Sequence, residues 1–202
     1  MGLEAHMRKG ERTRTMVLER AANLFNTKGY AASSLSEIMA ATGLEKGGIY
    51  NHFSSKEALG LEAFDFAVEK IMQRYEASLA GKTHALERLK AVTEVFREMM
   101  FDPVVRGGCP VMNASIEADD ANPALRDRVR RVFTQWRTIM LGILEKGVAR
   151  GELRREINGE QLATVMIATL EGAVMLSRLY RDPAHLERAV DFLVAHLETL
   201  KT

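Results

Sequence analysis

The sequence predicts an all-α protein of about nine helices, and three observations support this fold class. Apolar residues recur every three or four positions along most of the chain, which is the period of an amphipathic helix. Only four prolines occur among 202 residues, so long stretches lack a helix breaker. No run alternates apolar and polar residues between turn signals, as half-buried strands do, so we expect no sheet.

Start and stop signals divide the periodic pattern into separate helices. Two capping boxes, Ser34–Glu37 and Ser54–Glu57, place serine and glutamate side chains where they satisfy free backbone amides at a helix start. Asn122-Pro123 forms an N-cap and a first helical residue, whereas the prolines and glycines of 102–110 indicate a break. Residues 2–6 are treated as an extension ahead of a start at Met7. The expected helices cover residues 17–28, 35–42, 45–52, 57–80, 86–100, 123–150, 159–176 and 183–197.

Composition excludes several classes of protein. The single cysteine, Cys109, rules out internal disulfides and a multi-cysteine zinc site, and it fits a reducing cytoplasm. No uncharged stretch approaches the roughly 18 residues of a membrane span. Gly81-Lys82-Thr83 is similar to the end of a P-loop, but Glu76 stands where its first glycine belongs. We therefore predict no membrane segment, no metal, no cofactor and no enzymatic activity.

Charge is distributed unevenly along the chain. The whole chain carries a net charge of only +1. Residues 1–56 hold 8 basic and 5 acidic residues, a net +3, whereas residues 57–202 hold 20 and 22, a net −2. Any binding to a polyanion is therefore expected from the first segment.

Two short helices separated by Gly43 match a helix-turn-helix, whose second helix lies in the major groove of DNA. Lys46 begins that second helix, and Gly47 and Gly48 follow, where missing side chains let the backbone approach DNA closely. Each glycine costs about 1 kcal/mol of helix propensity relative to alanine, so stability alone does not explain the pair. Asn51 is suited to bond the edge of adenine.

These residues resemble the N-terminal domain of TetR-type transcriptional regulators. The likeness covers about residues 10–60 and rests on a set of residues at fixed spacing: Gly29-Tyr30, Ser33-Ser34, Ile38, Thr42-Gly43-Leu44, Lys46-Gly47, Ile49-Tyr50, His52-Phe53 and Ser55–Leu59. The resemblance implies a homodimer in which residues 1–56 form a three-helix domain that binds double-stranded operator DNA. Residues 57–202 would then form a helical domain that dimerises and binds a small effector.

The expected DNA contacts follow from the resemblance and from the residue chemistry. They are Ser33, Ser34, Lys46, Gly47, Tyr50, Asn51, His52 and Lys56. Two positions depart from the family pattern: Glu45 replaces a hydroxyl residue that caps the recognition helix, and Gly48 offers no side chain to a base. Tyr50 also fits a core ring, whereas His52 and Lys56 also fit solvated surface residues.

The later helices predict an effector site. Phe133, Trp136 and Met140 share one helix face because they are three and four residues apart. Asn113 offers a polar group in an apolar stretch, with a helix cap or loop bond as its alternative role. The candidate ligand-binding residues are Phe96, Met99, Met112, Asn113, Phe133, Trp136, Met140, Met166 and Leu170. Ordinary core packing explains this set equally well.

The sequence therefore predicts a cytoplasmic repressor that binds a palindromic operator as a homodimer and is released by a small, largely apolar effector. The broad apolar faces of 159–176 and 183–197 suit a four-helix dimer interface. One alternative is an all-helical ligand-binding protein or enzyme that does not bind DNA. Another is a regulator controlled without a small ligand. Cys109 fits a small apolar core residue, with a redox or electrophile sensor as the second interpretation.

Overall fold

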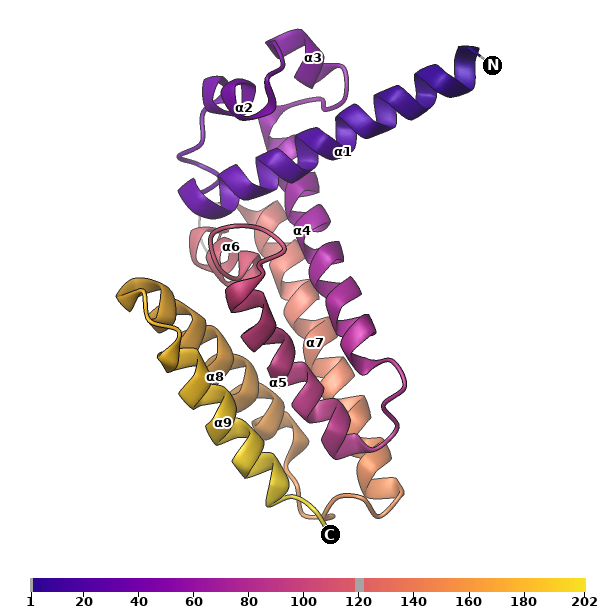
Figure 1. Cartoon of the computed structure of the whole chain (residues 1–202), viewed down its shortest axis with the longest axis vertical. Coiled ribbons are helices and arrows are strands. Elements are labelled where there is room, and N and C mark those ends of the chain that lie inside the picture. The colour runs from indigo at the N-terminus through magenta and orange to yellow at the C-terminus, as the bar shows by residue number, and fades with distance from the viewer. Residues whose placement is uncertain (1, 119–121) are drawn as a thin grey trace. The chain divides into compact units, whose positions relative to one another are not determined.

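A computed structural model describes residues 2–118 and 122–202, and every regular element within these ranges is a helix (Figure 1). The prediction of an all-α protein is therefore confirmed. The helices are α1 (Gly2–Lys28), α2 (Leu35–Thr42), α3 (Lys46–Tyr50), α4 (Lys56–Leu79), α5 (Ala85–Phe101), α6 (Pro110–Ala118), α7 (Pro123–Ala149), α8 (Gly159–Tyr180) and α9 (Ala184–Glu198).

The chain forms two compact units, and each is discontinuous in sequence. Unit 1 consists of residues 1–70 and 105–129, and unit 2 consists of residues 71–104 and 130–202. Helices α4 and α7 therefore each contribute residues to both units. The segment 1–56, predicted to bind DNA, lies wholly within unit 1, which also contains α6.

The core of unit 1 is built on the inner face of α1. Val17, Ala21 and Phe25 of this face are buried, and α1 packs against α2. Phe25 stacks on Tyr30 with ring centroids 5.0 Å apart. The spacing of these buried residues is the helical period predicted from sequence, but α1 begins at Gly2, well before the predicted start. Residues 2–16 were wrongly left out because their apolar periodicity is weak.

The predicted break over residues 102–110 is present as an irregular segment from 102 to 109, but Pro110 begins helix α6, which the sequence did not predict. The irregular segment before it turns sharply through Gly107 and Gly108, which have φ values of 113° and 88°. A Cβ atom on Gly107 would lie 2.5 Å from the carbonyl oxygen of Asn26. Glycine is therefore required at this position by both backbone conformation and close packing.

The start of α4 corrects a second prediction. The S-x-x-E pattern pointed to Ser54 as the cap, but the hydroxyl of Ser55 accepts the hydrogen bond from the Ala58 amide, at 3.0 Å. The helix accordingly begins at Lys56. The cap predicted at Asn122 is present, with its side-chain oxygen accepting from Leu125 N at 3.1 Å, and Asn158 caps α8 in the same way by accepting from Gln161 N at 3.0 Å.

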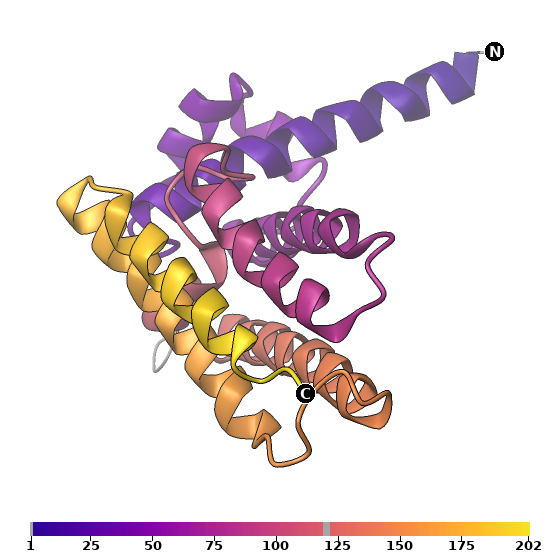
Figure 2. The same cartoon turned by 60° about the horizontal axis from the view of Figure 1, so that its bottom comes forward.

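Unit 2 is a helical bundle in which α8 and α9 run side by side and both pack against α5 (Figures 1 and 2). Its core includes Leu89, Phe96, Trp136 and Met166. Helix α8 is long and apolar enough by composition to cross a membrane, and core helices of water-soluble bundles share both properties. Its buried face, which includes Glu171, packs within unit 2.

Candidate DNA interface and ligand site

The first helix of the helix-turn-helix is held by a complete capping box. Ser34 Oγ accepts from Glu37 N at 3.2 Å, and Glu37 Oε2 accepts from Ser34 N at 2.9 Å. Glu37 also pairs with Lys28, the last residue of α1. The hydrogen bond from Lys28, followed by those from Ser34, lowers the pKa of Glu37 from its ordinary 4.5 to about 2. These contacts tie the start of α2 to the end of α1.

The turn and α3 follow from local sequence. Gly43 ends α2 in the left-handed conformation, with φ 70°, which favours glycine. Ile49 and Phe53 are buried and anchor α3 and the turn after it, and the guanidinium of Arg14 lies 5.1 Å from the centre of the Phe53 ring. Glu45 stands at the N-cap, and its side chain makes no capping bond. Helix α3 is therefore fixed by its apolar face.

The outer side of α3 is polar and lacks side chains at its centre. Lys46, Gly47 and Asn51 are exposed, and Tyr50 is half-buried. The ammonium of Lys46 lies 5.8 Å from the centre of the Tyr50 ring, a cation–π distance. His52 is half-buried beside Phe53. These side chains come from α3 and the turn after it, the segment that the sequence predicts to contact DNA.

Packing within the chain does not explain the glycines of α3. A Cβ atom on Gly47 would meet nothing within 4 Å, and one on Gly48 would lie 3.5 Å from Leu44 Cβ, an ordinary contact. Neither residue has a positive φ. Alanine would fit at both positions and would favour the helix by about 1 kcal/mol each. The glycines therefore leave α3 open to something outside the chain.

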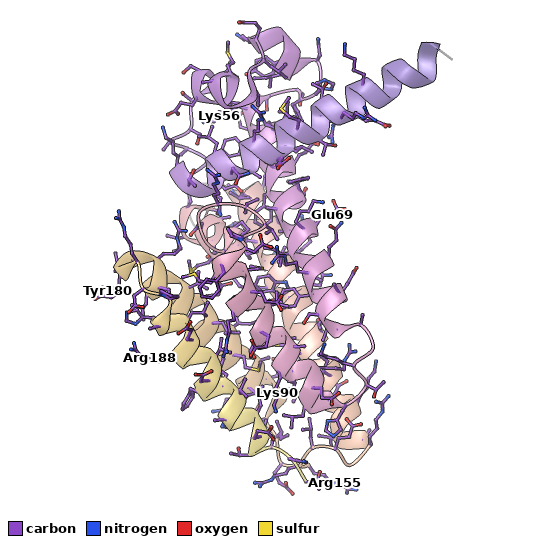
Figure 3. The ribbon with its side chains drawn as sticks, viewed as in Figure 1. Lys56, Glu69, Lys90, Arg155, Tyr180 and Arg188 are labelled. Carbon is purple, nitrogen blue, oxygen red and sulfur yellow. The ribbon has the colours of Figure 1, made fainter. Side chains whose placement is uncertain are left out.

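Three other residues predicted to contact DNA have roles inside unit 1. Ser33 is buried, and its hydroxyl donates to Gly29 O at 2.6 Å. The hydroxyl of Ser34 caps α2. Lys56 begins α4 and is half-buried, with its ammonium 3.4 Å from Ala31 O (Figure 3).

Unit 1 also contains a polar network that the sequence did not reveal. The amide of Asn113 donates to Asn26 Oδ1 at 2.9 Å, to Asn26 O at 3.2 Å and to Gly107 O at 2.8 Å. The carboxylate of Glu117 accepts from the backbone amides of Tyr30 at 2.8 Å and Ala31 at 2.6 Å. Both side chains thus join α6 to the end of α1. No local pattern marks the bonds to Asn26, Tyr30 and Ala31, which connect residues more than 80 positions apart.

An aromatic cluster lies in unit 2. The indole ring of Trp136 lies 5.5 Å from Phe133, 6.3 Å from Phe96 and 6.0 Å from Tyr75, measured between ring centroids. Trp136 is 4% exposed, and its Nε1 has no hydrogen-bond partner among the described residues. An unsatisfied buried donor costs about 1–3 kcal/mol, so a ligand with an acceptor would stabilise this site. Tyr75 was not among the predicted residues.

The other predicted ligand-binding residues divide between the units. Met140, Met166 and Leu170 are buried in unit 2, and Met99 is half-buried there. Met112 and Asn113 belong to α6 and lie in unit 1. Cys109, just before α6, is buried.

The outer faces of α8 and α9 expose large apolar side chains. Leu179 is 71% exposed and Phe192 is 66% exposed, and Tyr180 projects outward at the end of α8 (Figure 3). Val165 and Met175 lie on the same helix as Leu179 and are also exposed. Large exposed apolar surfaces of this kind mark protein interaction sites.

Comparison with known proteins shows which family the chain is similar to. A family model described as "Bacterial regulatory proteins, tetR family" matches residues 17–63, and "Tetracyclin repressor-like, C-terminal domain" matches residues 85–193. A crystal structure of a TetR transcriptional regulator from Chloroflexus aurantiacus J-10-FL is 48% identical, covers 96% of this chain and 98% of its own, and superposes with a TM-score of 0.93.

Two further relatives cover most of the chain. A TetR-family transcriptional regulator of known structure from Cytophaga hutchinsonii is 31% identical, with 96% of this chain and 97% of its own covered and a TM-score of 0.86. The HTH-type transcriptional repressor DhaR from Mycobacterium sp. strain GP1 is 26% identical over 93% of this chain and 91% of its own length.

Proposed function

The chain belongs to the TetR family of transcriptional regulators, and on this premise we propose that it represses transcription as a homodimer that binds a palindromic operator through α3. Regulators of this family are DNA-binding proteins that generally have no enzymatic activity. Because genomic DNA is the proposed partner, we place the protein in the cytoplasm.

The observation that carries this proposal is the pair of glycines on α3. Packing does not require them, they cost helix stability, and they adjoin the exposed ammonium of Lys46. A backbone without side chains lies close to the floor of the major groove, while Lys46 and Asn51 reach base edges and Tyr50, His52 and Lys56 reach phosphates. The hydroxyls of Ser33 and Ser34, which bond inside unit 1, are left out of this proposed contact set.

The proposed dimer forms through the outer faces of α8 and α9. Pairing these helices with their copies across a two-fold axis buries Leu179 and Phe192, which are exposed in the single chain. Such a dimer presents two α3 helices to successive major grooves, which lie about 34–36 Å apart on one side of the duplex. The operator is accordingly proposed to be a palindrome.

The proposed effector binds among the aromatic rings around Trp136 in unit 2. Phe96 and Phe133 offer apolar contacts, and the unpartnered Nε1 of Trp136 offers one hydrogen bond. The effector is therefore a largely apolar molecule with an acceptor oxygen or nitrogen. Asn113, whose amide is bonded within unit 1, is left out of this site.

Release of DNA is proposed to be a population shift. Helices α4 and α7 contribute to both units, so a ligand that favours one arrangement of their unit 2 segments also biases unit 1. A coupling free energy of about 1–3 kcal/mol changes operator affinity roughly 5- to 150-fold.

Selection of bound duplexes from a random DNA library tests the DNA-binding proposal. We expect a palindromic consensus, and two variants then separate the roles of two lysines. Lys46→Ala should lower affinity for the consensus more than affinity for random DNA. Lys56→Ala should lower both affinities equally, and it should reduce the slope of log affinity against log salt concentration by about one phosphate contact per subunit. Recovery of no consensus, or unchanged binding by both variants, would contradict the proposal.

Matched ligand pairs test the effector site. We expect aryl ketones to raise the melting temperature of the protein more than the corresponding alkylbenzenes, because only the ketones accept from Trp136 Nε1. Trp136→Phe removes the unsatisfied donor, retains a smaller aromatic ring, and should abolish this difference between the two series. A difference that persists in Trp136→Phe would place the effector elsewhere.

A further inference from the structure

A second site, away from Trp136, is a hollow of about 450 Å³ in unit 2, where the turn after α4, the start of α5 and the end of α7 meet. Four basic side chains line it, and Glu152 is the one acidic residue among its lining. We call it the basic hollow, and its basic residues are Lys82, Arg88, Lys146 and Arg150. The lining carries a net charge of +3 in a chain whose total is +1.

Contacts within the protein position these cations without neutralising them. Lys82 Nζ donates to Ser78 O at 2.6 Å, and Arg88 Nη1 donates to Lys82 O at 3.0 Å. Both acceptors are uncharged backbone carbonyls. The ammonium of Lys146, an exposed residue, makes no hydrogen bond or ion pair with any residue that the structure describes. An anion in the basic hollow would therefore meet side chains that are partly ordered and still charged.

Glu152 neutralises little of this positive charge because its carboxylate also binds a backbone amide at the start of α5. Its Oε2 accepts from the backbone amide of Ala85 at 2.7 Å and so caps the start of α5. Its Oε1 lies 3.8 Å from Arg150, whose Nη1 also donates to Thr83 O at 3.1 Å. The carboxylate thus offsets at most one of the four cations.

A glycine in the middle of α7 keeps the basic hollow open. A Cβ atom on Gly142 would meet nothing within 4 Å, although glycine costs about 1 kcal/mol in a helix interior. Gly147, five residues on, differs, because a Cβ atom there would lie 2.5 Å from Ala85 Cβ. Close packing of α7 on α5 thus explains why residue 147 is glycine. No contact among the described residues explains why residue 142 is glycine.

We propose that the basic hollow binds a small organic anion, a carboxylate or phosphate attached to a short apolar body. The cations hold the anionic group, and Ile139 and Ile143, which also line the hollow, contact the apolar part. Lys82 and Thr83 of the lining lie three and four residues after the end of α4, so occupancy stabilises the turn that follows this helix. The site is distinct in chemistry from the aromatic cluster around Trp136.

Calorimetric titration of the full-length protein without DNA tests this site directly. The probes are hexanoate and hexyl phosphate, with 1-hexanol as the neutral control and inorganic phosphate as the control without an apolar body. We expect at least one organic anion to bind more tightly than both controls, and the better of the two identifies the head group. Binding of neither anion, or equal binding of 1-hexanol, would overturn the proposal.

Two variants tie that binding to the basic hollow. Lys146→Gln removes a charge that has no internal partner and should weaken anion binding about threefold to tenfold, the value of one charge-assisted hydrogen bond. Gly142→Met should abolish binding by filling the space, while raising thermal stability. Arg131→Gln, an exposed position on α7 outside the hollow, is the control. Unchanged binding in both test variants would refute the assignment, and because no DNA is present this outcome leaves the repressor proposal intact.

Discussion

At the scale of single residues, glycines show how differently one residue type is used in this chain. Gly107 is required by its φ of 113° and by its approach to Asn26, and Gly147 is required by the packing of α7 on α5. Gly47 has neither reason and lies on the outer side of α3. A substitution at Gly47 can therefore change DNA binding without removing any contact that stabilises the fold.

Replacement of Gly47 by alanine should move stability and DNA affinity in opposite directions. We expect Gly47→Ala to raise the free energy of unfolding by up to about 1 kcal/mol, because alanine favours the helix and meets no neighbouring atom. Operator affinity should fall, because the added methyl group prevents the closest approach to the groove. Chemical denaturation and fluorescence anisotropy measure the two quantities.

The matched control for this variant is Gly142→Ala, which also replaces an open helix-interior glycine but lies in unit 2. It should raise stability and leave operator affinity unchanged. A Gly47→Ala protein that binds the operator as tightly as the wild type would contradict the proposal that glycine at this position lets α3 approach the groove closely.

At the scale of elements, local signals explain what the sequence could predict. The caps at Ser34, Asn122 and Asn158 all bond to amides three residues away, so a short pattern contains the whole interaction. Helix α6 could not be predicted in this way. It follows two glycines and starts on a proline, and bonds from Asn113 and Glu117 to residues near position 30 hold it.

The residues of the candidate sites likewise divide into those that one sequence motif contains and those that only the fold brings together. The polar residues of α3 and of the turn after it are neighbours in sequence, so one motif contains them. The basic hollow joins Lys82, Lys146 and Glu152, which only the fold brings together. Ser33 was expected to face DNA, but its burial depends on packing that a motif does not encode.

The start of α2 should make stability depend on acid pH through Glu37. The pKa of this carboxyl is lowered in the folded protein to about 2 from 4.5, so its stabilising effect is complete above 4.5 and is lost as the pH falls towards 2. We expect the melting temperature of the wild type to fall more over this interval than that of Glu37→Gln. Thermal unfolding followed by circular dichroism measures the difference.

A second variant assigns that effect to its cause. Lys28→Met removes the hydrogen bond that contributes most to the lowered pKa of Glu37, so the pH-dependent difference should shrink. An identical acid sensitivity in wild type and Glu37→Gln would show that the capping box does not depend on the charge of the carboxylate.

At the scale of the whole molecule, unit 2 leaves an apolar face on α8 and α9 uncovered within one chain. The combined replacement of Leu179 and Phe192 by glutamate places two charges in the proposed interface, where desolvation and mutual repulsion oppose association. Because both side chains are exposed in the single chain, helical content should not change. Sedimentation should shift from a dimer to a species of 22.6 kDa, the mass of one chain.

Operator binding provides the second measurement for this variant. Affinity for a full palindrome should fall strongly, while the weaker affinity for one half-site should be retained. Gln135→Glu, on an exposed position of α7, is the control and should remain dimeric. A dimer that survives the double replacement would move the interface to another surface.

Two separate stretches of the chain form unit 1, and this limits how hybrids of such regulators can be made. A hybrid made by grafting only residues 1–56 onto another sensor would leave behind Glu117 and Asn113, and the amides of Tyr30 and Ala31 would lose their acceptor. The transplantable head is therefore the pair of pieces 1–70 and 105–129 taken from one parent. A single crossover within residues 71–104, in the laboratory or in a genome, would separate the two pieces, so the proposed DNA-binding segment and residues 105–129 must be inherited together.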